Sequence, residues 1–125
     1  MIIGIGTDIV NIQRIERAVE RFGERFINKV FTDKEAIVCK GKKDPSQHLA
    51  ARFAAKEAVL KSLGTGISNG IGFKDVEVSR MKGKRPEIIL HGKGKEMAES
   101  LGVKDIHISI SHDGGLAVAF AVIEG

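Results

Sequence analysis

The segment from Ser46 to Gly64, SQHLAARFAAKEAVLKSLG, constrains the possible folds of this chain more than any other. Its large apolar residues recur at helical spacing and mark one side of a single helix: Leu49, Phe53, Leu60 and Leu63. We expect Ser46 to be the N-cap and Gly64 to be the left-handed residue after the last turn. Such a helix buries its apolar side against other elements, so the rest of the chain must supply a cover for it.

Apolar segments at both ends of the chain predict strands. Residues 1–10 are rich in β-branched side chains, and Gly4 and Gly6 permit another backbone to approach closely. Residues 106–111 alternate apolar and polar, as in a half-buried strand, and a Gly-rich turn follows. Residues 116–123 are almost wholly apolar and small, which predicts a strand buried on both faces and indicates a subunit interface.

The remaining segments predict a helix at the N-terminal side and a hairpin. After Asn11, an expected N-cap, apolar residues recur at spacings of three and four, and Gly23 predicts a kink or a second short helix. Residues 76–80 and 87–90 predict two strands joined by a basic tip. A short helix is expected over 93–101.

Composition limits the class of protein. With 125 residues the chain has room for one domain, and 42% hydrophobic residues exclude a disordered chain. No apolar run is long enough to span a bilayer, no basic leader is visible, and Cys39 is the single cysteine, so we expect a cytoplasmic protein without membrane partners. We expect a single α+β domain over 1–125, with a mainly antiparallel sheet packed against the long helix.

Three residues on two predicted elements form a candidate catalytic cluster. Asp8 is a carboxylate in an apolar strand, where a charge needs a partner or a metal, although it could also cap the following helix. Glu57 and Lys61 share a helical face with Ala50 and Ala54, whose small side chains let another backbone come close. The alternative for Glu57 and Lys61 is an ordinary surface pair one helical turn apart.

Together these residues are typical of a site for Mg²⁺ and a polyphosphate. Mg²⁺ takes one or two carboxylates together with phosphate oxygens and water. Lys61 would then offset charge on a leaving group. Arg52, Lys42 and Lys43 could bind further phosphate, or could each be a solvated surface charge.

A row of arginines follows the first predicted helix. Arg14, Arg17, Arg21 and Arg25 recur at spacings of three and four, apart from a row of glutamates. The row suits an acidic helical partner or a phosphate backbone, and pairing within the helix is the alternative.

Four histidines and a Gly-rich loop are the other candidates for chemistry in the chain. His112 stands where a strand breaks into a Gly-rich turn, a common place for a ligand contact. The other three histidines, His48, His91 and His107, are interpreted as surface or structural residues. The loop that follows Gly64 lacks the Gly-Lys-Ser/Thr ending of a P-loop.

Four sequence blocks in order resemble the holo-acyl-carrier-protein synthase family. They are GIGTDIVNIQRI, FINKVFTDKE, RFAAKEAVLKSLGTGI and HISISHDGGLAVAFAVI, and together they span nearly the whole chain. The resemblance implies a homotrimer with the 4′-phosphopantetheinyl transferase fold. It also implies transfer of phosphopantetheine from coenzyme A to a serine of apo-acyl carrier protein, release of adenosine 3′,5′-bisphosphate, and a role in fatty acid biosynthesis.

The resemblance also implies a role for each candidate residue. Asp8 and Glu57 would be the Mg²⁺ ligands, Glu57 would take the serine proton directly or through a metal-bound water, and Lys61 would assist the departing phosphate. The implied coenzyme A-binding residues are Lys42, Lys43, Arg52, Gly64, Arg85, Pro86 and His112. The implied carrier-protein contacts are Arg14, Arg17, Arg21 and Arg25.

A non-catalytic alternative is a small basic module that binds nucleic acid. The net charge of +4 and the arginine row favour it. The chain has neither Tyr nor Trp, the residues on which bases usually stack, so no nucleic-acid partner is expected.

Overall fold

The computed structural model describes residues 1–64 and 70–125, so most of the predicted loop after Gly64 lies outside the described residues. The elements follow in this order: β1 (Ile2–Asn11), α1 (Ile12–Phe22), α2 (Glu24–Val30), α3 (Asp33–Lys40), α4 (Pro45–Ser62), the 3-10 helix η2 (Phe73–Asp75), β2 (Val76–Ser79), β3 (Glu87–Leu90), α5 (Gly92–Leu101), β4 (Asp105–Asp113) and β5 (Leu116–Glu124). None of the helices among these residues has the length and apolar character that a membrane crossing requires.

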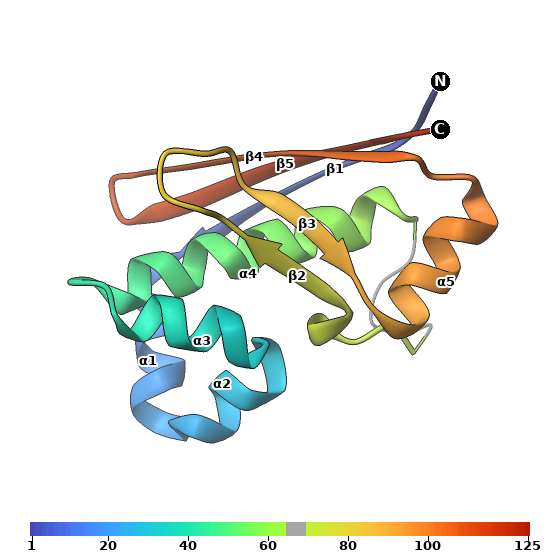
Figure 1. The fold of residues 1–125 in the computed structure, drawn as a ribbon. Coiled ribbons are helices and arrows are strands. Elements are labelled where there is room, and N and C mark those ends of the chain that lie inside the picture. Colours follow the sequence, from blue (N-terminus) through green and yellow to red (C-terminus); the bar gives the residue numbers. More distant parts are fainter. Residues whose placement is uncertain (65–69) are drawn as a thin grey trace.

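The strands form two antiparallel sheets in place of the one that was expected. The larger sheet has the strand order β1-β5-β4, with β5 in the centre (Figure 1). The smaller sheet is the hairpin β2-β3, which the sequence predicted as a pair. The fold is therefore α+β, as expected from the patterns of apolar residues.

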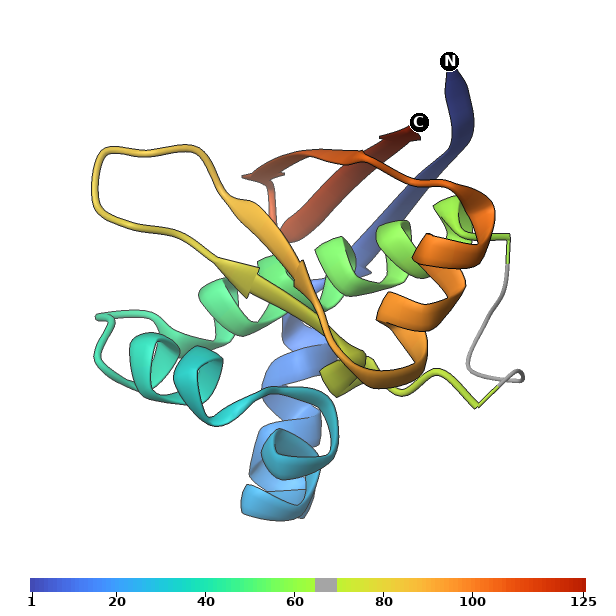
Figure 2. The ribbon, with the colours of Figure 1, turned by 45° about the vertical axis from the view of Figure 1, so that its right-hand side comes forward.

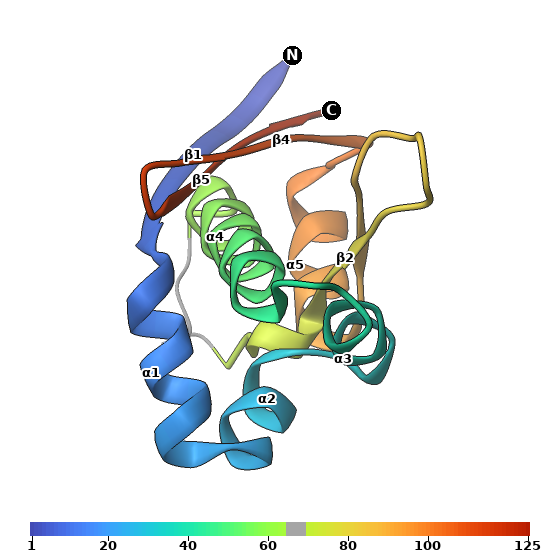
Figure 3. The same cartoon turned by 90° about the vertical axis from the view of Figure 1, so that its left-hand side faces the viewer.

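Helix α4 lies at the centre of the molecule. Seen nearly end-on in Figure 3, it is covered by the three-stranded sheet on one side, by α1 on another, and by β2, α5 and the smaller helices on the others. Ten of its 18 residues are buried, including the polar residues Arg52, Lys56 and Ser62. The apolar side predicted from the sequence is only part of what this helix buries.

Two glycines let β1 lie directly on α4. A methyl group added at Gly4 would lie 2.0 Å from the carbonyl oxygen of Ser62, and one added at Gly6 would lie 2.1 Å from that of Ala58. The predicted close approach is therefore confirmed, and it occurs at Ala58 and Ser62, which continue the row of Ala50 and Ala54 at spacings of four. Because side chains alternate along a strand, the next residue that points toward α4 is Asp8.

The caps of α4 differ partly from the prediction. The N-cap is Asp44, whose side chain accepts a hydrogen bond from the amide of Gln47, and Pro45 occupies the first turn. Ser46 was the wrong choice because proline in the first turn, where no amide partner is needed, moves the start of the helix two residues earlier. Gly64 has φ of +75°, as predicted for the residue that ends this helix.

The chain between β1 and α4 forms three short helices. Asn11 caps α1 through its side chain, and Gly23, with φ of +56°, separates α1 from α2, so the predicted break is confirmed. Helix α3 was not predicted. Its signal was present as a capping box, in which Thr32 and Glu35 each accept a hydrogen bond from the other's backbone amide.

Strand β5 is buried on one face only within this chain. Ala117, Ala119 and Ala121 are buried against α4, but Phe120 is 56% exposed. In the single chain the second face is therefore exposed, and the subunit interface that the sequence indicated for it stays a prediction. The outward face of the larger sheet carries an exposed apolar surface that β1 and β5 share: Ile5, Ile9, Leu116 and Phe120.

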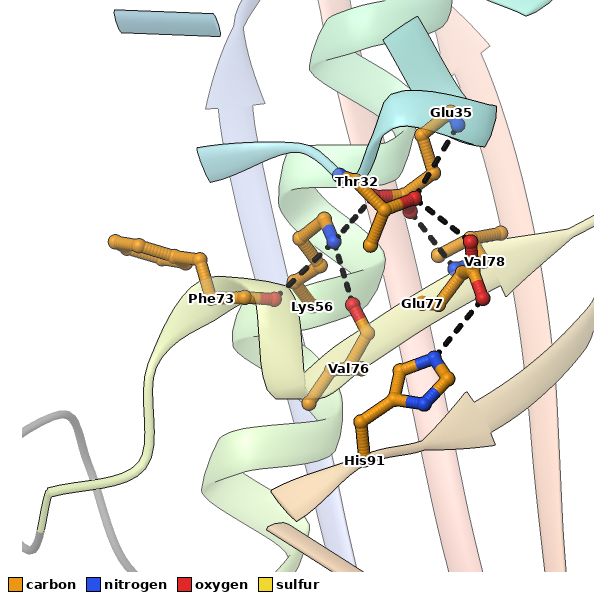
Figure 4. A network of polar contacts seen from close by, with 8 residues as sticks. All are labelled: Thr32, Glu35, Lys56, Phe73, Val76, Glu77, Val78 and His91. Carbon is orange, nitrogen blue, oxygen red and sulfur yellow. Dashed lines mark hydrogen bonds and ion pairs between the residues drawn. The ribbon is translucent and has the colours of Figure 1, made fainter. Parts of the chain in front are cut away.

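A buried ion pair joins the layers beneath α4. Lys56 Nζ lies 2.6 Å from a carboxylate oxygen of Glu35, both side chains are fully buried, and the ammonium also donates to the carbonyls of Phe73 and Val76 (Figure 4). The other oxygen of Glu35 accepts from the amide of Val78. The pair therefore ties α3, α4 and the hairpin together with every polar group satisfied.

The same network continues to the end of β3. Thr32 donates from its hydroxyl to Glu77, and the second oxygen of Glu77 lies 3.0 Å from His91 Nε2 (Figure 4). The hydrogen bonds from Thr32 and His91 lower the pKa of Glu77 in spite of its burial. His91 is thus a structural residue, as the sequence analysis had it.

We expect Gly6→Ala to destabilise the protein by about 2 kcal/mol or more, because the new methyl group would overlap the backbone of α4. Gly72→Ala is the matched control, since a methyl group there meets nothing within 4 Å. Urea unfolding of the two variants measures the difference. Equal stabilities would contradict the proposed contact between β1 and α4.

We expect Lys56→Met to lower the free energy of unfolding by about 3–5 kcal/mol, because it leaves the Glu35 carboxylate buried without a positive charge beside it. The double variant Glu35→Gln/Lys56→Met removes both charges of the pair and should lose less stability. Lys40→Met removes the ion pair of Lys40 with Glu24, whose side chains are 50% and 62% exposed. It should lower the free energy of unfolding by about 1 kcal/mol at most. A single variant as stable as the double variant would show that the buried charge is not what matters.

Candidate active site

Asp8, Glu57 and Lys61 come together where β1 crosses α4. Lys61 Nζ lies 3.1 Å from Asp8 Oδ1 and 3.0 Å from the carbonyl oxygen of Thr7. Lys61 therefore pairs with the strand and does not form the ordinary surface pair with Glu57. Asp8 does not cap the following helix either, since Asn11 does so. Both alternatives considered for these residues are thus replaced by a three-residue cluster.

The two carboxylates are close enough to influence each other. Burial raises the pKa of Glu57, and the negative charge of Asp8 raises it further. Lys61 and Arg14 act in the opposite direction, which also places the Arg14 guanidinium near this cluster. Glu57 is therefore a carboxylate whose charge is only partly compensated.

The cluster fits a divalent cation that is shared with a phosphate ligand. A second positive charge between Asp8 and Glu57 would relieve the repulsion that raises the pKa of Glu57. Among residues 1–64 and 70–125, no group of three or more His, Cys, Asp or Glu side chains forms a complete metal site. Two carboxylates alone suit Mg²⁺, which keeps waters and phosphate oxygens as its other ligands, better than zinc.

A basic cavity of about 580 Å³ lies on the other flank of α4. Its walls come from the first turns of α4, the end of α3, the connection between β2 and β3, and the end of β4. The hairpin connection that lines it is the loop at the left of Figure 2. The polar residues that line it are Lys42, Gln47, His48, Arg52, Arg80, Lys82, Ser111 and His112.

Arg52 is the most deeply placed cation of this cavity. It is 8% exposed, and its Nε has no hydrogen-bond partner among the residues that the structure describes. A buried guanidinium nitrogen without a partner is costly unless a ligand accepts its hydrogen bond. With Lys42, Arg80 and Lys82 also on its walls, the cavity is suited to a phosphate-bearing ligand.

The structure brings together some of the predicted coenzyme A-binding residues and not others. Lys42, Arg52, Pro86 and His112 line the cavity. Lys43 and Arg85 lie beside it in sequence but are not among its lining residues, and Gly64 lies past the opposite end of α4. These three were carried over from the family pattern, in which spacing alone does not fix the direction of a side chain.

Sequence reasoning missed His48 and Gln47 as lining residues. His48 was interpreted as a surface or structural residue, yet it lines the cavity. The available signal was spacing: His48 lies four residues before Arg52, on the same face of the helix. Gln47 Nε2 lies 2.7 Å from His112 Nε2, so the start of α4 contacts the end of β4.

The cluster and the cavity occupy opposite flanks of α4. Asp8 lies on β1, one edge of the larger sheet, and His112 lies on β4, the other edge. Figure 3 shows α4 between these two edges, with α1 on the side of β1. A single ligand that contacted both places within one chain would have to pass around the helix.

The arginine row is divided by the break at Gly23. Arg14, Arg17 and Arg21 are exposed on α1, whereas Arg25 is exposed on α2. Arg21 lies over the ring of Phe22, with its guanidinium carbon 5.2 Å from the ring centroid. The expected continuous row of four on one helix is therefore wrong, and Arg14 is the member nearest the carboxylates.

A sequence model of the 4′-phosphopantetheinyl transferase superfamily matches residues 4–121. The chain belongs to this superfamily. The match spans β1, α4 and most of β5, the elements that carry the cluster and the sheet. It confirms the family that the four sequence blocks indicated, and it makes the protein an enzyme of the transferase class.

Relatives within the superfamily are similar over their full lengths. The chain is 43% identical to a holo-acyl-carrier-protein synthase of Koribacter versatilis, over 99% of each chain. It is also similar to the crystal structure of this enzyme from Neisseria meningitidis, with 34% identity, a TM-score of 0.92 and all of both chains covered. The enzyme from Helicobacter pylori, solved in complex with coenzyme A, is 38% identical with a TM-score of 0.84, over 96% of this chain and 99% of that one.

Membership in the 4′-phosphopantetheinyl transferase superfamily supports the enzymatic interpretation over the nucleic-acid-binding alternative. The basic charge of the chain has a structural explanation in the cavity and the α1 surface, where cations of separate elements gather. Six phenylalanines supply all of the aromatic side chains of the protein. Four of them are partly or fully buried, so they do not form a stacking surface for bases.

Proposed function

We propose that this chain transfers the 4′-phosphopantetheine arm of coenzyme A to a serine of apo-acyl carrier protein and releases adenosine 3′,5′-bisphosphate. The product would serve fatty acid biosynthesis. The observation that carries the proposal is the convergence of Asp8, Glu57 and Lys61 in a member of the phosphopantetheinyl transferase superfamily. Similar proteins are holo-acyl-carrier-protein synthases, and one of them was solved with coenzyme A.

The carboxylates of Asp8 and Glu57 would hold Mg²⁺ against the pyrophosphate of coenzyme A. When bound, the cation would polarise a phosphoryl oxygen and offset the charge of the transition state. Asp8 is fixed for this role by its strand, which the glycines hold against α4. Glu57 is fixed by the buried middle of the same helix.

Glu57 would accept the proton of the serine, and Lys61 would offset the charge on the departing phosphate. The serine oxygen attacks the phosphorus that bears the pantetheine arm, and its proton passes to the Glu57 carboxylate, directly or through a water. The bond from this phosphorus to the bridging oxygen breaks, and its electron pair goes to the departing phosphate. Lys61, with its side chain 53% exposed, can turn from Asp8 to that phosphate and offset its charge.

The basic cavity would hold the adenosine end of coenzyme A. Arg52 and Lys42 would contact phosphate oxygens, and Pro86 and His112 would contact the nucleoside. Lys43 and Arg85 adjoin Lys42 and Pro86 on the same loops, so a change of side-chain rotamer would be needed for them to reach the ligand. Gly64 is proposed only by analogy with the family.

A homotrimer is part of this proposal. The carboxylate cluster and the cavity lie on opposite flanks of α4, so a neighbouring chain that brought its cavity to this cluster would complete a site at the subunit boundary. The exposed apolar surface of the sheet supports such an assembly, because Ile5 and Ile9 are 70% and 65% exposed in the single chain. Arg14, Arg17 and Arg21 on α1, with Arg25 on α2, would dock the acidic carrier protein beside Asp8 and Glu57.

We expect an apo-acyl carrier protein to gain the mass of the phosphopantetheine arm when it is incubated with this protein, coenzyme A and Mg²⁺. EDTA should prevent the gain. Asp8→Asn and Glu57→Gln should each lower kcat by about 100-fold or more without unfolding the protein, because each removes a ligand or base at the reacting phosphate. Intact-mass spectrometry measures the transfer.

Glu99→Gln, an exposed carboxylate on α5 outside the site, is the matched control and should keep full activity. Full activity of both the Asp8 and Glu57 variants would remove the argument for the metal site. No transfer to several carrier proteins by the folded wild type would overturn the proposed function itself.

We expect Arg14→Glu to raise KM for the carrier protein about tenfold at low salt, because it reverses a charge beside the reacting carboxylates. The affinity for coenzyme A should change little. Arg25→Glu, beyond the break at Gly23, should have a smaller effect. Steady-state kinetics at two salt concentrations measures both variants, and an unchanged KM for Arg14→Glu would exclude the docking role of the row.

A further inference from the structure

His48 occupies a position that the proposed mechanism does not use. It is half-buried in the second turn of α4 and lines the basic cavity beside Arg52, the guanidinium whose Nε has no partner among the described residues. The imidazole of His48 and the guanidinium of Arg52 therefore border the same cavity. Histidine is the side chain that changes charge most readily near neutral pH.

The groups that face His48 come from every element around the cavity, and nearly all are positive. They are Lys42 and Asp44 from the α3–α4 connection, Arg52 from α4, Arg80 and Lys82 from the hairpin connection, and His112 from the end of β4. Asp44 is the only acid in this set, and its side chain also caps α4. His48 therefore stands in an uncompensated positive field.

Burial and this field both favour the neutral imidazole in the free protein. Burial lowers the pKa of His48, Arg52 and Lys42 lower it further, and the opposing influence of Asp44 is smaller. A phosphate dianion in the cavity would reverse the field, because it adds negative charge among the same cations. The protonated imidazole would then gain both a favourable field and a hydrogen-bond acceptor.

We propose that His48 takes up a proton from solvent when a nucleotide phosphate enters the basic cavity, and that it then donates a hydrogen bond to that phosphate as an imidazolium. The inference rests on the proposed function for the identity of the ligand, the adenosine end of coenzyme A. It adds a ligand-binding residue and makes binding of the phosphate dependent on pH.

The sign of the pH dependence follows from the charge states. The bound state favours the protonated imidazole and the free state the neutral one, so binding strengthens as pH falls through the range between the two pKa values. One linked proton changes affinity by at most about tenfold per pH unit. The phosphate group has the opposite effect on the pH dependence of binding. The cations of the cavity favour its dianion, so a phosphate that binds as the dianion releases its proton.

Isothermal titration calorimetry of adenosine 3′,5′-bisphosphate near neutral pH, without Mg²⁺, tests the proposal. Titration in two buffers of different ionisation enthalpy gives the number of protons exchanged on binding. We expect wild type to take up more protons per ligand than His48→Asn, and its affinity to fall severalfold more between pH 6 and pH 8 than that of the variant. His91→Asn, a histidine outside the cavity, should behave as wild type.

The outcomes separate this inference from the proposed function. Equal proton exchange by wild type and His48→Asn would overturn it. If His112→Asn abolished the extra proton uptake and His48→Asn did not, the proton would belong to His112 and the inference would also be overturned. Absence of binding to wild type would also overturn it. Proton-linked binding by a protein that fails to transfer phosphopantetheine would support the inference and refute the proposed function.

Discussion

The contact between β1 and α4 is the constraint on which the rest of the structure depends. Two glycines bring the strand so close to the helix that its backbone lies on the carbonyls of Ala58 and Ser62. At this separation the following inward residue, Asp8, cannot avoid the side chain of Lys61. A longer side chain at either glycine would lift the strand, and the carboxylate would move away with it. Packing and the proposed chemistry are thus set by the same few atoms.

The candidate cluster could be predicted from the sequence because it depends on two periodicities. Alternation along β1 places Asp8 on the face of Gly4 and Gly6, and the helical repeat places Glu57 and Lys61 one turn apart. The cavity could not be derived in this way. Its walls belong to three stretches far apart in sequence, 38–52, 78–86 and 110–112, and no local pattern shows that the start of α4 meets the end of β4. Residue chemistry singled out Arg52 and His112 separately, only the family resemblance assigned both to one ligand, and neither pointed to His48.

The errors of the sequence analysis share a physical cause. Apolar periodicity identifies the side of a helix that packs against neighbours, but α4 is surrounded and also buries polar residues. Lys56 was therefore unremarkable in the sequence, although its ammonium joins α3 and the hairpin to the helix through Glu35. The strand over 116–123 is the opposite case, since its apolar composition includes a face that the single chain leaves exposed and for which the sequence predicted a subunit interface.

The placement of the two flanks on one central helix has a consequence for how such an enzyme can vary. In the proposed mechanism, the residues that bind the nucleotide and those that act on the reacting phosphate lie on the same helix, α4, but contact different neighbouring elements. The hairpin connection and the end of α3 can accumulate substitutions that alter the choice of donor while β1 and its carboxylate stay fixed. β1 tolerates fewer substitutions, because any residue that replaces one of its inward glycines displaces the strand and, with it, the exposed apolar surface of the sheet.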